Sequence, residues 1–369
     1  MRLSRVVFSD LPGWKDNDLR GVKDAFAKSC GEFAKTDPAK PMGGAGYAGT
    51  FGDWQKVCNT PIPGQTVEGP RDFFEKNFVP YSVTGGPTPA GLFTGYYEPE
   101  ITGSRTRQGK YQTPVYGLPS DLISVDLGAF RPNLKGERIA GRVQGQALVP
   151  YDTRADIEQK GVPAAKILFY AEDPVAVFFL QIQGSGRVRF DDGSMARVAY
   201  AGQNGQIYTA IGAVLIRQGA LTRENVSLQT IRDWLKANPD KAADVMNTNA
   251  SFVFFKELPL GNPALGAIGS ENVQLTPGNS LAVDLRLHAL GVPMYLSTTT
   301  PDNAPFNEIM IAQDTGGAIR GAVRGDVFWG TGAAAEDRAG KMKQTGKLFV
   351  LLPKSVADKL GPSAEYPVQ

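Results

Sequence analysis

Two aspartates near the C-terminal end of the chain, Asp314 and Asp326, have neighbours that favour acid–base chemistry. The apolar residues 309–312 precede Asp314, and such a short run between turn residues predicts a buried strand. Gly316 and Gly317 follow Asp314, and glycines allow a positive φ and a close approach of the backbone. Two acids at strand ends beside glycines are typical of a shallow acidic cleft, although each Asp could equally cap a turn.

Strand alternation predicts the surroundings of Asp326. With a period of two, Asp326 shares one face of its strand with Arg324 and Phe328, while Val327 and Trp329 lie on the other face. Partial desolvation by the apolar neighbours would raise the pKa of Asp326 and keep it protonated, as a proton donor in glycoside cleavage must be. The positive charge of Arg324 would act against this effect, unless its side chain points to substrate.

The tripeptide formed by Asp314, Thr315 and Gly316 also occurs in aspartic peptidases. Those enzymes need two aspartates that share one proton, normally from two such tripeptides. The sequence contains no second Asp-Thr-Gly and no Asp-Ser-Gly. A homodimer could supply the second copy, but the subunits of dimeric aspartic peptidases are far smaller than this chain. The sequence therefore disfavours a peptidase.

The composition of the chain indicates a globular protein that is rich in strands. Its length of 369 residues makes two domains the natural expectation. The 43 glycines and 26 prolines favour many short strands and turns over a helical bundle. The 39 basic and 37 acidic residues nearly cancel, so no electrostatic field for nucleic-acid binding is expected. No run of residues approaches the ~20 apolar residues of a membrane-spanning helix.

Histidine and cysteine are too scarce for a metal site rich in either residue. His288 is the single histidine and lies among leucines, where a packed structural role is expected. Cys30 and Cys58 are too few for a cysteine-rich zinc site. They could form one disulfide, which would imply an oxidising compartment, or remain two free buried thiols. Residues 1–8 are partly basic but have no long apolar core, so we expect no signal peptide in them.

The chain begins with predicted helices and continues with predicted strands. Apolar residues at helical spacing predict helices over residues 19–33 and 71–79, with a helical turn over residues 54–58. A strand is predicted over residues 91–100, in which Thr94, Tyr96 and Glu98 alternate with Phe93, Gly95 and Tyr97. Hydroxyl, aromatic and carboxyl groups in this pattern suit a sugar-binding surface. An ordinary sheet with inward-packed aromatic residues would give the same pattern.

The middle of the chain mixes short strands, turns and helices. Residues 176–186 predict a strong strand that ends in a Gly-Ser-Gly turn, with Gln181 and Gln183 on one face. Glutamines that line a cleft need partners, and a polyhydroxyl ligand could supply them. Residues 191–193, Asp-Asp-Gly, predict a hairpin turn. Helices are predicted over residues 208–217, 227–237 (with Ser227 as N-cap) and 240–247, and strands over residues 251–255, 291–297 and 348–352.

Three separated segments carry a resemblance to a known family. They are TGYYEP at residues 94–99, FFLQIQGSG at residues 178–186 and AQDTGGAIRG at residues 312–321. Together they resemble the membrane-bound lytic murein transglycosylase A family. The third segment, with Asp326 and Asp337, looks like that family's C-terminal 3D module, which is named for three aspartates. The resemblance covers about residues 8–355, with the three motifs in the family's order.

The resemblance implies a fold that is mainly β with peripheral helices. Residues 1–105 and 247–369 would form a double-psi β-barrel catalytic domain with an N-terminal helical part. Residues 106–246 would form an inserted second β-barrel domain, the other wall of the substrate groove.

The implied activity is cleavage of the MurNAc–GlcNAc β-1,4 bond of peptidoglycan, with formation of 1,6-anhydro-MurNAc ends. One Asp would act first as general acid and then as general base. Motif position assigns this role to Asp326 and makes Asp314 its supporting partner, while Asp337 is the loosest match.

The resemblance also implies substrate contacts, partners and location. The implied substrate-binding residues are Thr94, Tyr96, Tyr97, Glu98, Gln181, Gln183, Ser185, Gln313, Gly316, Gly317 and Trp329. No metal or other cofactor and no nucleic acid is implied; the partners are peptidoglycan glycan strands, and a monomer is expected. The implied location is the periplasm of a Gram-negative bacterium. Members are usually lipid-anchored to the outer membrane, but residues 1–8 have no lipobox cysteine, so an anchor would lie outside this sequence.

An exported enzyme matures where thiols oxidise, so the resemblance also favours a disulfide between Cys30 and Cys58. Two other functions remain open at this point. A glycoside hydrolase on the same barrel would need a second carboxylate to activate water, for which Asp314 or Glu98 are candidates. A non-catalytic peptidoglycan-binding protein would need only the tyrosine and glutamine surfaces.

Overall fold

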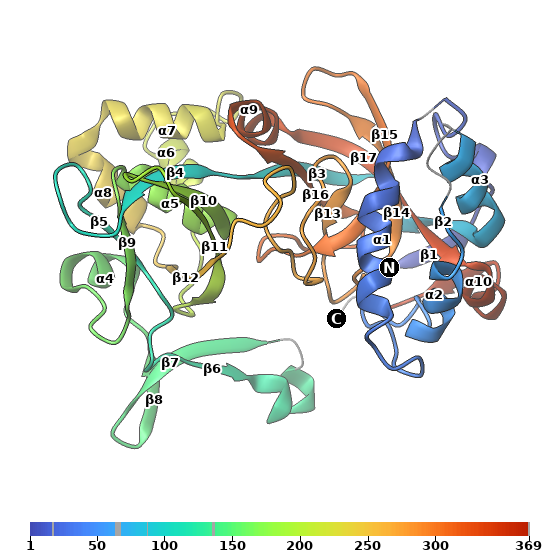
Figure 1. Ribbon diagram of the computed structural model, residues 1–369, viewed down its shortest axis with the longest axis horizontal. Helices are drawn as coiled ribbons and strands as arrows, with labels where there is room; N and C mark the ends of the chain where they lie inside the picture. The colour runs from blue at the N-terminus through green and yellow to red at the C-terminus, as the bar shows by residue number, and fades with distance from the viewer. Residues whose placement is uncertain (17, 63–67, 87, 135–136, 368–369) are drawn as a thin grey trace. The chain divides into compact units, whose positions relative to one another are not determined.

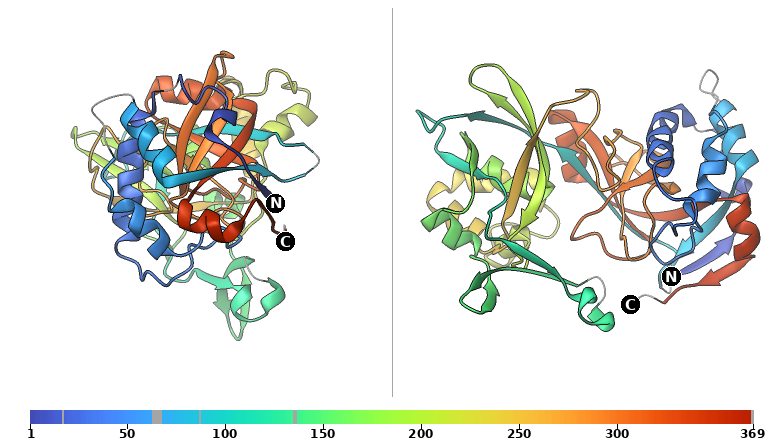
Figure 2. Two further views of the ribbon diagram at one scale, coloured as in Figure 1. Left: turned by 90° about the vertical axis from the view of Figure 1, so that its right-hand side faces the viewer. Right: turned by 60° about the horizontal axis from the view of Figure 1, so that its bottom comes forward.

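The computed structural model describes residues 1–16, 18–62, 68–86, 88–134 and 137–367 (Figures 1 and 2). The chain divides into two compact units. Unit 1 combines both ends of the chain, Met1–Tyr97 and Ala264–Gln369, and unit 2 is the continuous stretch Glu98–Pro263. The divisions thus follow residues 97 and 263, whereas the expected domain boundaries followed residues 105 and 246. The difference arises because the flanking strands β4 (Glu100–Ser104) and β12 (Val253–Leu258) both pair with strands of unit 2.

Unit 1 is built around a nine-stranded sheet. Its strands are β1 (Arg2–Arg5), β2 (Phe78–Thr84), β3 (Gly91–Glu98), β13 (Ser280–Ala282), β14 (Pro293–Thr299), β15 (Pro305–Asp314), β16 (Arg324–Thr331), β17 (Lys343–Pro353) and β18 (Ser363–Glu365). Their order across the sheet is β14-β15-β13-β16-β3-β17-β2-β1-β18, and β14 also pairs with β17. Strand β3, from the N-terminal segment, therefore lies between two strands from the C-terminal segment (Figure 1).

The strand that leads to Asp314 is among the most deeply buried in unit 1. Residues 309–312 of β15 are all 0% exposed. The predicted buried strand before Asp314 is confirmed, although it begins earlier, at Pro305. Because both faces of this part of the strand are covered, its sequence is a continuous apolar run and not an alternating one.

Helices near the N-terminus pack against the sheet of unit 1. They are α1 (Val22–Phe33), α2 (Phe51–Cys58) and α3 (Glu68–Asn77), close to the predicted positions. The disulfide predicted between Cys30 and Cys58 is confirmed and joins α1 to α2. It closes a loop with a sequence separation of 28, which stabilises the fold by about 3.6 kcal/mol in the chain-entropy model. Unit 1 also contains α9 (Ala333–Lys341), α10 (Lys354–Leu360) and 3-10 turns at Phe8–Asp10 and Leu19–Gly21.

Unit 2 combines two sheets with helices. The larger sheet has the order β12-β11-β10-β4-β9-β5, and the smaller one the order β6-β7-β8. The strands not yet given are β5 (Thr113–Tyr116), β6 (Ile123–Asp126), β7 (Arg138–Gln144), β8 (Ala147–Pro150), β9 (Ile167–Ala171), β10 (Ser185–Phe190) and β11 (Met195–Gln203). The helices are α4 (Arg154–Lys160), α5 (Pro174–Gln183), α6 (Ile211–Arg217), α7 (Leu228–Ala237) and α8 (Pro239–Asn247), with 3-10 turns at Leu127–Ala129 and Pro132–Leu134.

Two local predictions for unit 2 are confirmed by the structure. The Asp-Asp-Gly turn at residues 191–193 connects β10 to β11, which pair antiparallel. The side chain of Ser227 caps α7 by accepting a hydrogen bond from the backbone N of Thr230.

The strand predicted over residues 176–186 is wrong, because most of this segment forms the helix α5. The side chain of Asp173 caps the helix by accepting from the backbone N of Val175, and Pro174 occupies the first turn. Gly184 ends the helix in the left-handed conformation. Both ends of the helix thus had sequence signals, but the apolar run between them is buried on most sides and has no helical period.

The predicted class, mainly β with helices, is confirmed by these elements. His288 has the expected structural role, because it is fully buried and both ring nitrogens have partners, the Tyr47 hydroxyl at 2.9 Å and the Ala322 carbonyl oxygen at 2.8 Å. None of the helices in the described parts of the chain is long and apolar enough to cross a membrane.

Candidate active site

Asp314 and Asp326 occupy neighbouring positions in the sheet of unit 1. Asp314 is the last residue of β15, and Asp326 is the third residue of β16. Strand β13 lies between β15 and β16, and its residue Ala282 is in register with Asp314 on one side and with Asp326 on the other. Since adjacent strands lie about 4.8 Å apart, the two Asp Cα atoms are on the order of 10 Å apart. The sheet thus positions two carboxylates that are 12 residues apart in the sequence.

Strand β3 supplies a hydroxyl group to each of these carboxylates. The Thr94 hydroxyl donates to Oδ1 of Asp326 at 2.5 Å, and the Tyr96 hydroxyl donates to Oδ2 of Asp314 at 2.9 Å. Thr94 and Tyr96 are two residues apart and therefore share one face of the strand. The Tyr96 ring packs against Phe328, with ring centroids 5.2 Å apart.

The two carboxylates differ in how many of their oxygens are occupied. Oδ1 of Asp314 accepts hydrogen bonds from the backbone N of Ser270 at 3.1 Å and from its hydroxyl at 2.9 Å. Together with the Tyr96 bond to Oδ2, both oxygens of Asp314 are engaged. Asp326 accepts from Thr94 at Oδ1, whereas its Oδ2 has no hydrogen-bond partner among the described residues.

Burial raises the pKa of both aspartates above the ordinary value of an Asp. For Asp326 the bond from Thr94 and the charge of Arg324 act in the opposite direction, but burial outweighs them. Thr94 links Arg324 to Asp326, because Arg324 Nη2 donates to the Thr94 hydroxyl oxygen at 2.8 Å and this hydroxyl donates to Asp326. Burial also raises the pKa of Tyr96 well above its usual range, so its hydroxyl stays protonated and acts as the donor to Asp314.

The raised pKa of Asp326 predicts that Asp326→Asn stabilises the protein at neutral pH. A group whose pKa is higher in the folded than in the unfolded state stabilises the fold below the unfolded pKa, about 3.9, and loses this contribution as pH rises through the folded pKa. Asn does not titrate, so the difference in free energy of unfolding between variant and wild type should grow with pH. Urea unfolding from pH 4 to pH 8 measures this difference, with Asp337→Asn as control. A difference that is constant or falls with pH would contradict the prediction.

Both aspartates and their partners Thr94 and Tyr96 lie in segments that match models of known protein families. A family model described as the MltA specific insert domain matches residues 92–256, and a model described as the 3D domain matches residues 279–352. The membrane-bound lytic murein transglycosylase A of Escherichia coli (strain K12) is 33% identical over 267 residues. This match covers 70% of the chain and 65% of that relative, which is slightly under two thirds of its length.

Solved structures match nearly the whole chain. The membrane-bound lytic murein transglycosylase from Agrobacterium tumefaciens is 30% identical, with a TM-score of 0.85, and the match covers 97% of this chain and 99% of that one. The chain belongs to the membrane-bound lytic murein transglycosylase A family. Another member, E. coli MltA with bound chitohexaose, is 25% identical with a TM-score of 0.69, and the match covers 90% of both chains.

Several residues that the family resemblance implied lie elsewhere in unit 1. Gln313 is fully buried in the core. Its amide nitrogen donates to the Ala25 carbonyl oxygen and the Ser29 hydroxyl, and its amide oxygen accepts from the Ser280 hydroxyl. Trp329 lies on the face of β16 opposite Asp326, where it packs against Phe306 and under Arg338. Tyr97 is buried, as expected if the aromatic residues of this strand pack into the protein and do not form a sugar-binding surface.

The glycines after Asp314 also differ from expectation. Gly316 and Gly317 do not adopt a positive φ, whereas Gly321 does, at +116°. A Cβ on Gly316 would lie 3.0 Å from the Ile319 side chain, and one on Gly317 would meet no atom within 4 Å. Of the two glycines, only Gly316 is therefore closely approached, and the approaching group is the Ile319 side chain.

The remaining implied substrate residues belong to unit 2. Glu98 is fully buried and accepts from Arg187 Nε at 2.9 Å and from Arg197 Nε at 2.5 Å, so it is part of a buried ion cluster. Gln181 and Gln183 do not share a face, since two residues of a helix are about 200° apart. Gln181 is buried, and its Oε1 has no hydrogen-bond partner within the described parts of the chain. Ser185 begins β10 and pairs with Ala199.

Two residues that contribute to the site were not predicted from the sequence. Ser270, which binds Asp314 twice, lies in a loop where no periodic pattern marks it. Asp284 follows the short strand β13, and this pattern of an acid after an apolar run is the one that identified Asp314. Asp284 accepts from the backbone N of Gly321 at 2.9 Å and from Arg286 Nη2 at 2.7 Å, so it fixes the loop between Asp314 and Asp326.

Two further features of unit 1 are not part of this arrangement. Asp337, the loosest motif match, is exposed on α9 and forms an ion pair with Lys341 at 2.6 Å.

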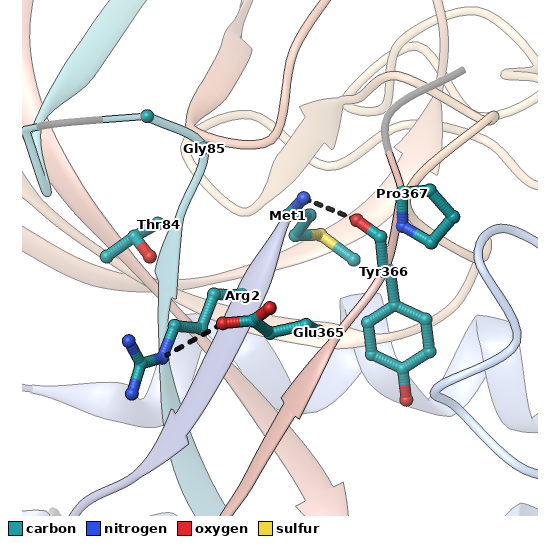
Figure 3. A pocket seen from close by; sticks show the side chains of 8 residues that line it. Met1, Arg2, Thr84, Gly85, Glu365, Tyr366 and Pro367 are labelled. Carbon is teal, nitrogen blue, oxygen red and sulfur yellow. Dashed lines mark hydrogen bonds and ion pairs between the residues drawn. The ribbon is translucent and has the colours of Figure 1, made fainter.

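A hollow of about 570 Å³ lies between the first residues of the chain and Glu365, Tyr366 and Pro367 (Figure 3). There Arg2 pairs with Glu365 at 3.9 Å, and the amino group of Met1 donates to the Tyr366 carbonyl oxygen. Among the described residues, no group of three or more His, Cys, Asp or Glu side chains could hold a metal ion.

Proposed function

We propose that this protein is a lytic transglycosylase that cleaves the β-1,4 bond between MurNAc and GlcNAc in peptidoglycan and leaves 1,6-anhydro-MurNAc ends. Membership of the family supports the reaction, and the chitohexaose bound to the E. coli relative supports a glycan chain as ligand. The observation that carries the assignment of roles is the difference between the two aspartates. Asp314 has both oxygens engaged by protein donors, whereas Asp326 has only Oδ1 engaged among the described residues.

In the proposed mechanism Asp326 transfers a proton twice. Protonated Asp326 gives its proton to the glycosidic oxygen as the bond from that oxygen to C1 of the muramyl sugar breaks. The resulting carboxylate accepts the proton of the C6 hydroxyl of the same sugar, and the C6 oxygen attacks C1. Because the nucleophile is already tethered to the reacting ring, neither a positioned water nor a second base is needed.

The neighbours of Asp326 prepare it for the first of these steps. Burial keeps the pKa of Asp326 raised, and a negative charge on Asp314 raises it further. Thr94 holds Oδ1, and Arg324 in turn holds Thr94, so that Oδ2 is the oxygen left for substrate. We assign Asp314 the role of a positioning residue that acts through charge and through Tyr96.

Part of the implied binding surface and architecture belongs to the same proposal. We infer that Thr94, Tyr96, Gly316 and Gly317 line the place where the sugar binds, since they adjoin the two aspartates. We infer a double-psi β-barrel for the catalytic domain; the pairing of β14 with β17 supports this, because it returns the strand order to its start. We further propose that the enzyme acts in the periplasm as a monomer attached to the outer membrane; the name of its membrane-bound relatives supports a membrane attachment.

Product analysis on intact murein sacculi tests the proposal. Purified protein should release muropeptides with 1,6-anhydro ends, which mass spectrometry distinguishes from reducing ends by the mass of one water. Reducing ends would indicate a glycoside hydrolase instead. Sedimentation with sacculi without any cleavage would indicate a peptidoglycan-binding protein.

A further inference from the structure

Helix α1 contacts both chain segments that meet at Asp314. One segment is the loop that begins at Ser270, whose backbone N and hydroxyl both donate to Oδ1 of Asp314. The other segment is the end of β15, where Gln313 directly precedes Asp314. The backbone N of Glu271 donates to the Gln313 carbonyl oxygen at 3.0 Å, so the two segments lie side by side at this point. The position of the Asp314 carboxylate therefore depends on what fixes Glu271 and Gln313.

The Ser29 hydroxyl of α1 connects these two residues through their side chains. It donates to Oε2 of Glu271 at 2.6 Å and accepts from the amide nitrogen of Gln313 at 2.9 Å. All three residues are buried, and Ser29 and Gln313 are 0% exposed. Hydrogen bonds are electrostatically stronger in such surroundings than in water, and removal of one partner leaves the other unsatisfied. One hydroxyl thus fixes the residue after Ser270 and the residue before Asp314.

Further contacts fix α1 itself beside the same loop. Nζ of Lys28 donates to the Gln274 carbonyl oxygen and to the Thr276 hydroxyl, both at 2.8 Å. The disulfide formed by Cys30, the residue after Ser29, joins the helix to α2. The helix is therefore a rigid support from which Ser29 reaches toward the active site.

We propose that Ser29 is a positioning residue of the cleavage reaction, which holds Asp314 in place beside the proton donor Asp326. This inference rests on the proposed function. A negative charge on Asp314 raises the pKa of Asp326. Because the interaction between charges weakens with distance, a displaced Asp314 lowers that pKa. The other charged and titratable groups that face Asp326 in the described parts of the chain are Arg324 on its own strand and Tyr96 on β3.

Ser29→Ala should lower kcat/KM for glycan cleavage by about 10–100-fold, since small displacements of supporting groups are costly, and should shift its pH profile. The general acid must be protonated, so the rate falls as pH rises through the pKa of Asp326. With this pKa lowered, the fall should occur at lower pH in the variant than in wild type. NMR titration of the Asp326 carboxyl carbon, assigned with Asp326→Asn, should show the same shift and needs no catalytic activity.

The double variant Ser29→Ala/Asp314→Asn tests whether Ser29 acts through Asp314. It should cleave no more slowly than Asp314→Asn alone, because the charge that Ser29 positions is already absent. Two effects that multiply would overturn the proposal.

Substitutions at Glu271 separate loss of the hydrogen bond from loss of the carboxyl group. Burial raises the pKa of Glu271 to about 8, so its neutral form prevails at neutral pH. Glu271→Gln resembles this form and can still accept from Ser29, so it should keep most of the rate. Glu271→Leu cannot accept and should shift the pH profile as Ser29→Ala does. Equal profiles of the two Glu271 variants would contradict the proposal.

Ser355→Ala is the matched control for stability. The Ser355 hydroxyl, on α10, also donates to a buried carboxylate of unit 1, Asp53, at 3.0 Å. Its loss should lower the midpoint of urea unfolding, as Ser29→Ala does, but leave the pH profile in place. The proposal is overturned if Ser29→Ala keeps the wild-type profile and titration, or if Ser355→Ala shifts them equally.

Two further measurements keep the test decisive. If Ser29→Ala fails to fold, Gln313→Met removes the bridge from its other end and should lower the pKa of Asp326 in the same way. The ends of the released products test the proposed function separately. If they are reducing ends, or if nothing is cleaved, the transglycosylase reaction is contradicted, while the NMR titration of Asp326 still decides the role of Ser29.

Discussion

Asp326→Asn should nearly abolish the release of anhydro-muropeptides while binding to murein is retained. The amide keeps the shape of the side chain and can still accept from Thr94, but it cannot give up and regain a proton. General acid–base catalysis typically contributes about 10²–10⁴-fold, and here one carboxyl would supply both the acid and the base. The measurement is the initial rate of anhydro-muropeptide release, together with co-sedimentation of each variant with sacculi.

Two matched substitutions show whether the loss is specific to Asp326. Asp314→Asn should reduce the rate by a smaller factor, because Asp314 acts through position and charge. Asp337→Asn should leave the rate unchanged, since Asp337 is exposed and pairs only with Lys341 among the described residues. If Asp326→Asn keeps a near-normal rate while Asp314→Asn is inactive, the roles of the two aspartates are reversed.

Glu98→Gln should destabilise unit 2 by about 3–5 kcal/mol, the usual cost of breaking a buried ion pair from one side. Glu98 is fully buried and faces two arginines, Arg187 and Arg197, that are themselves nearly inaccessible. The substitution keeps the size of the side chain but removes the negative charge that both guanidinium groups face. Urea unfolding followed by circular dichroism measures the effect as a fall in midpoint of the transition of unit 2.

Glu100→Gln is the control for this substitution. Glu100, on β4, pairs with Arg189, on β10, at 2.6 Å, but both side chains are substantially exposed. Exposed ion pairs contribute about 0–1 kcal/mol, so this variant should unfold close to wild type. Equal effects of the two substitutions would mean that the burial of Glu98 has no energetic importance.

The parts of the site that the sequence predicted are those that depend on local patterns. Asp314 could be predicted because the buried strand before it is a continuous apolar run. Asp326 could be predicted because strand alternation places it beside apolar residues. The period of two along β3 likewise put Thr94 and Tyr96 on one face, and both donate to the aspartates.

The parts that the sequence did not predict depend on contacts between distant segments. Ser270 reaches Asp314 across 44 residues, and nothing in the local sequence around it encodes that contact. Gln313 was assigned to substrate by its place in a motif, but helix α1 supplies partners for its amide from 284 and 288 residues away. Helix α5 was mistaken for a strand because an apolar run that is covered on most sides has no period to identify it.

The order of strands in the sheet of unit 1 has a consequence for synthesis and export. Strand β3 pairs with β17, and β2 pairs with β17 as well, so the N-terminal segment acquires these partners only when residues 343–353 are available. Unit 2 is continuous in sequence and can become compact before the N-terminal segment of unit 1 has paired with β17. Pairings between such distant strands form slowly, since the intervening chain must first be closed into a loop. Until residues 343–353 of a growing or translocating chain are available, β3 lacks its β17 partner and β2 can pair only with β1. A chaperone that covers these strand edges would protect the protein from aggregation.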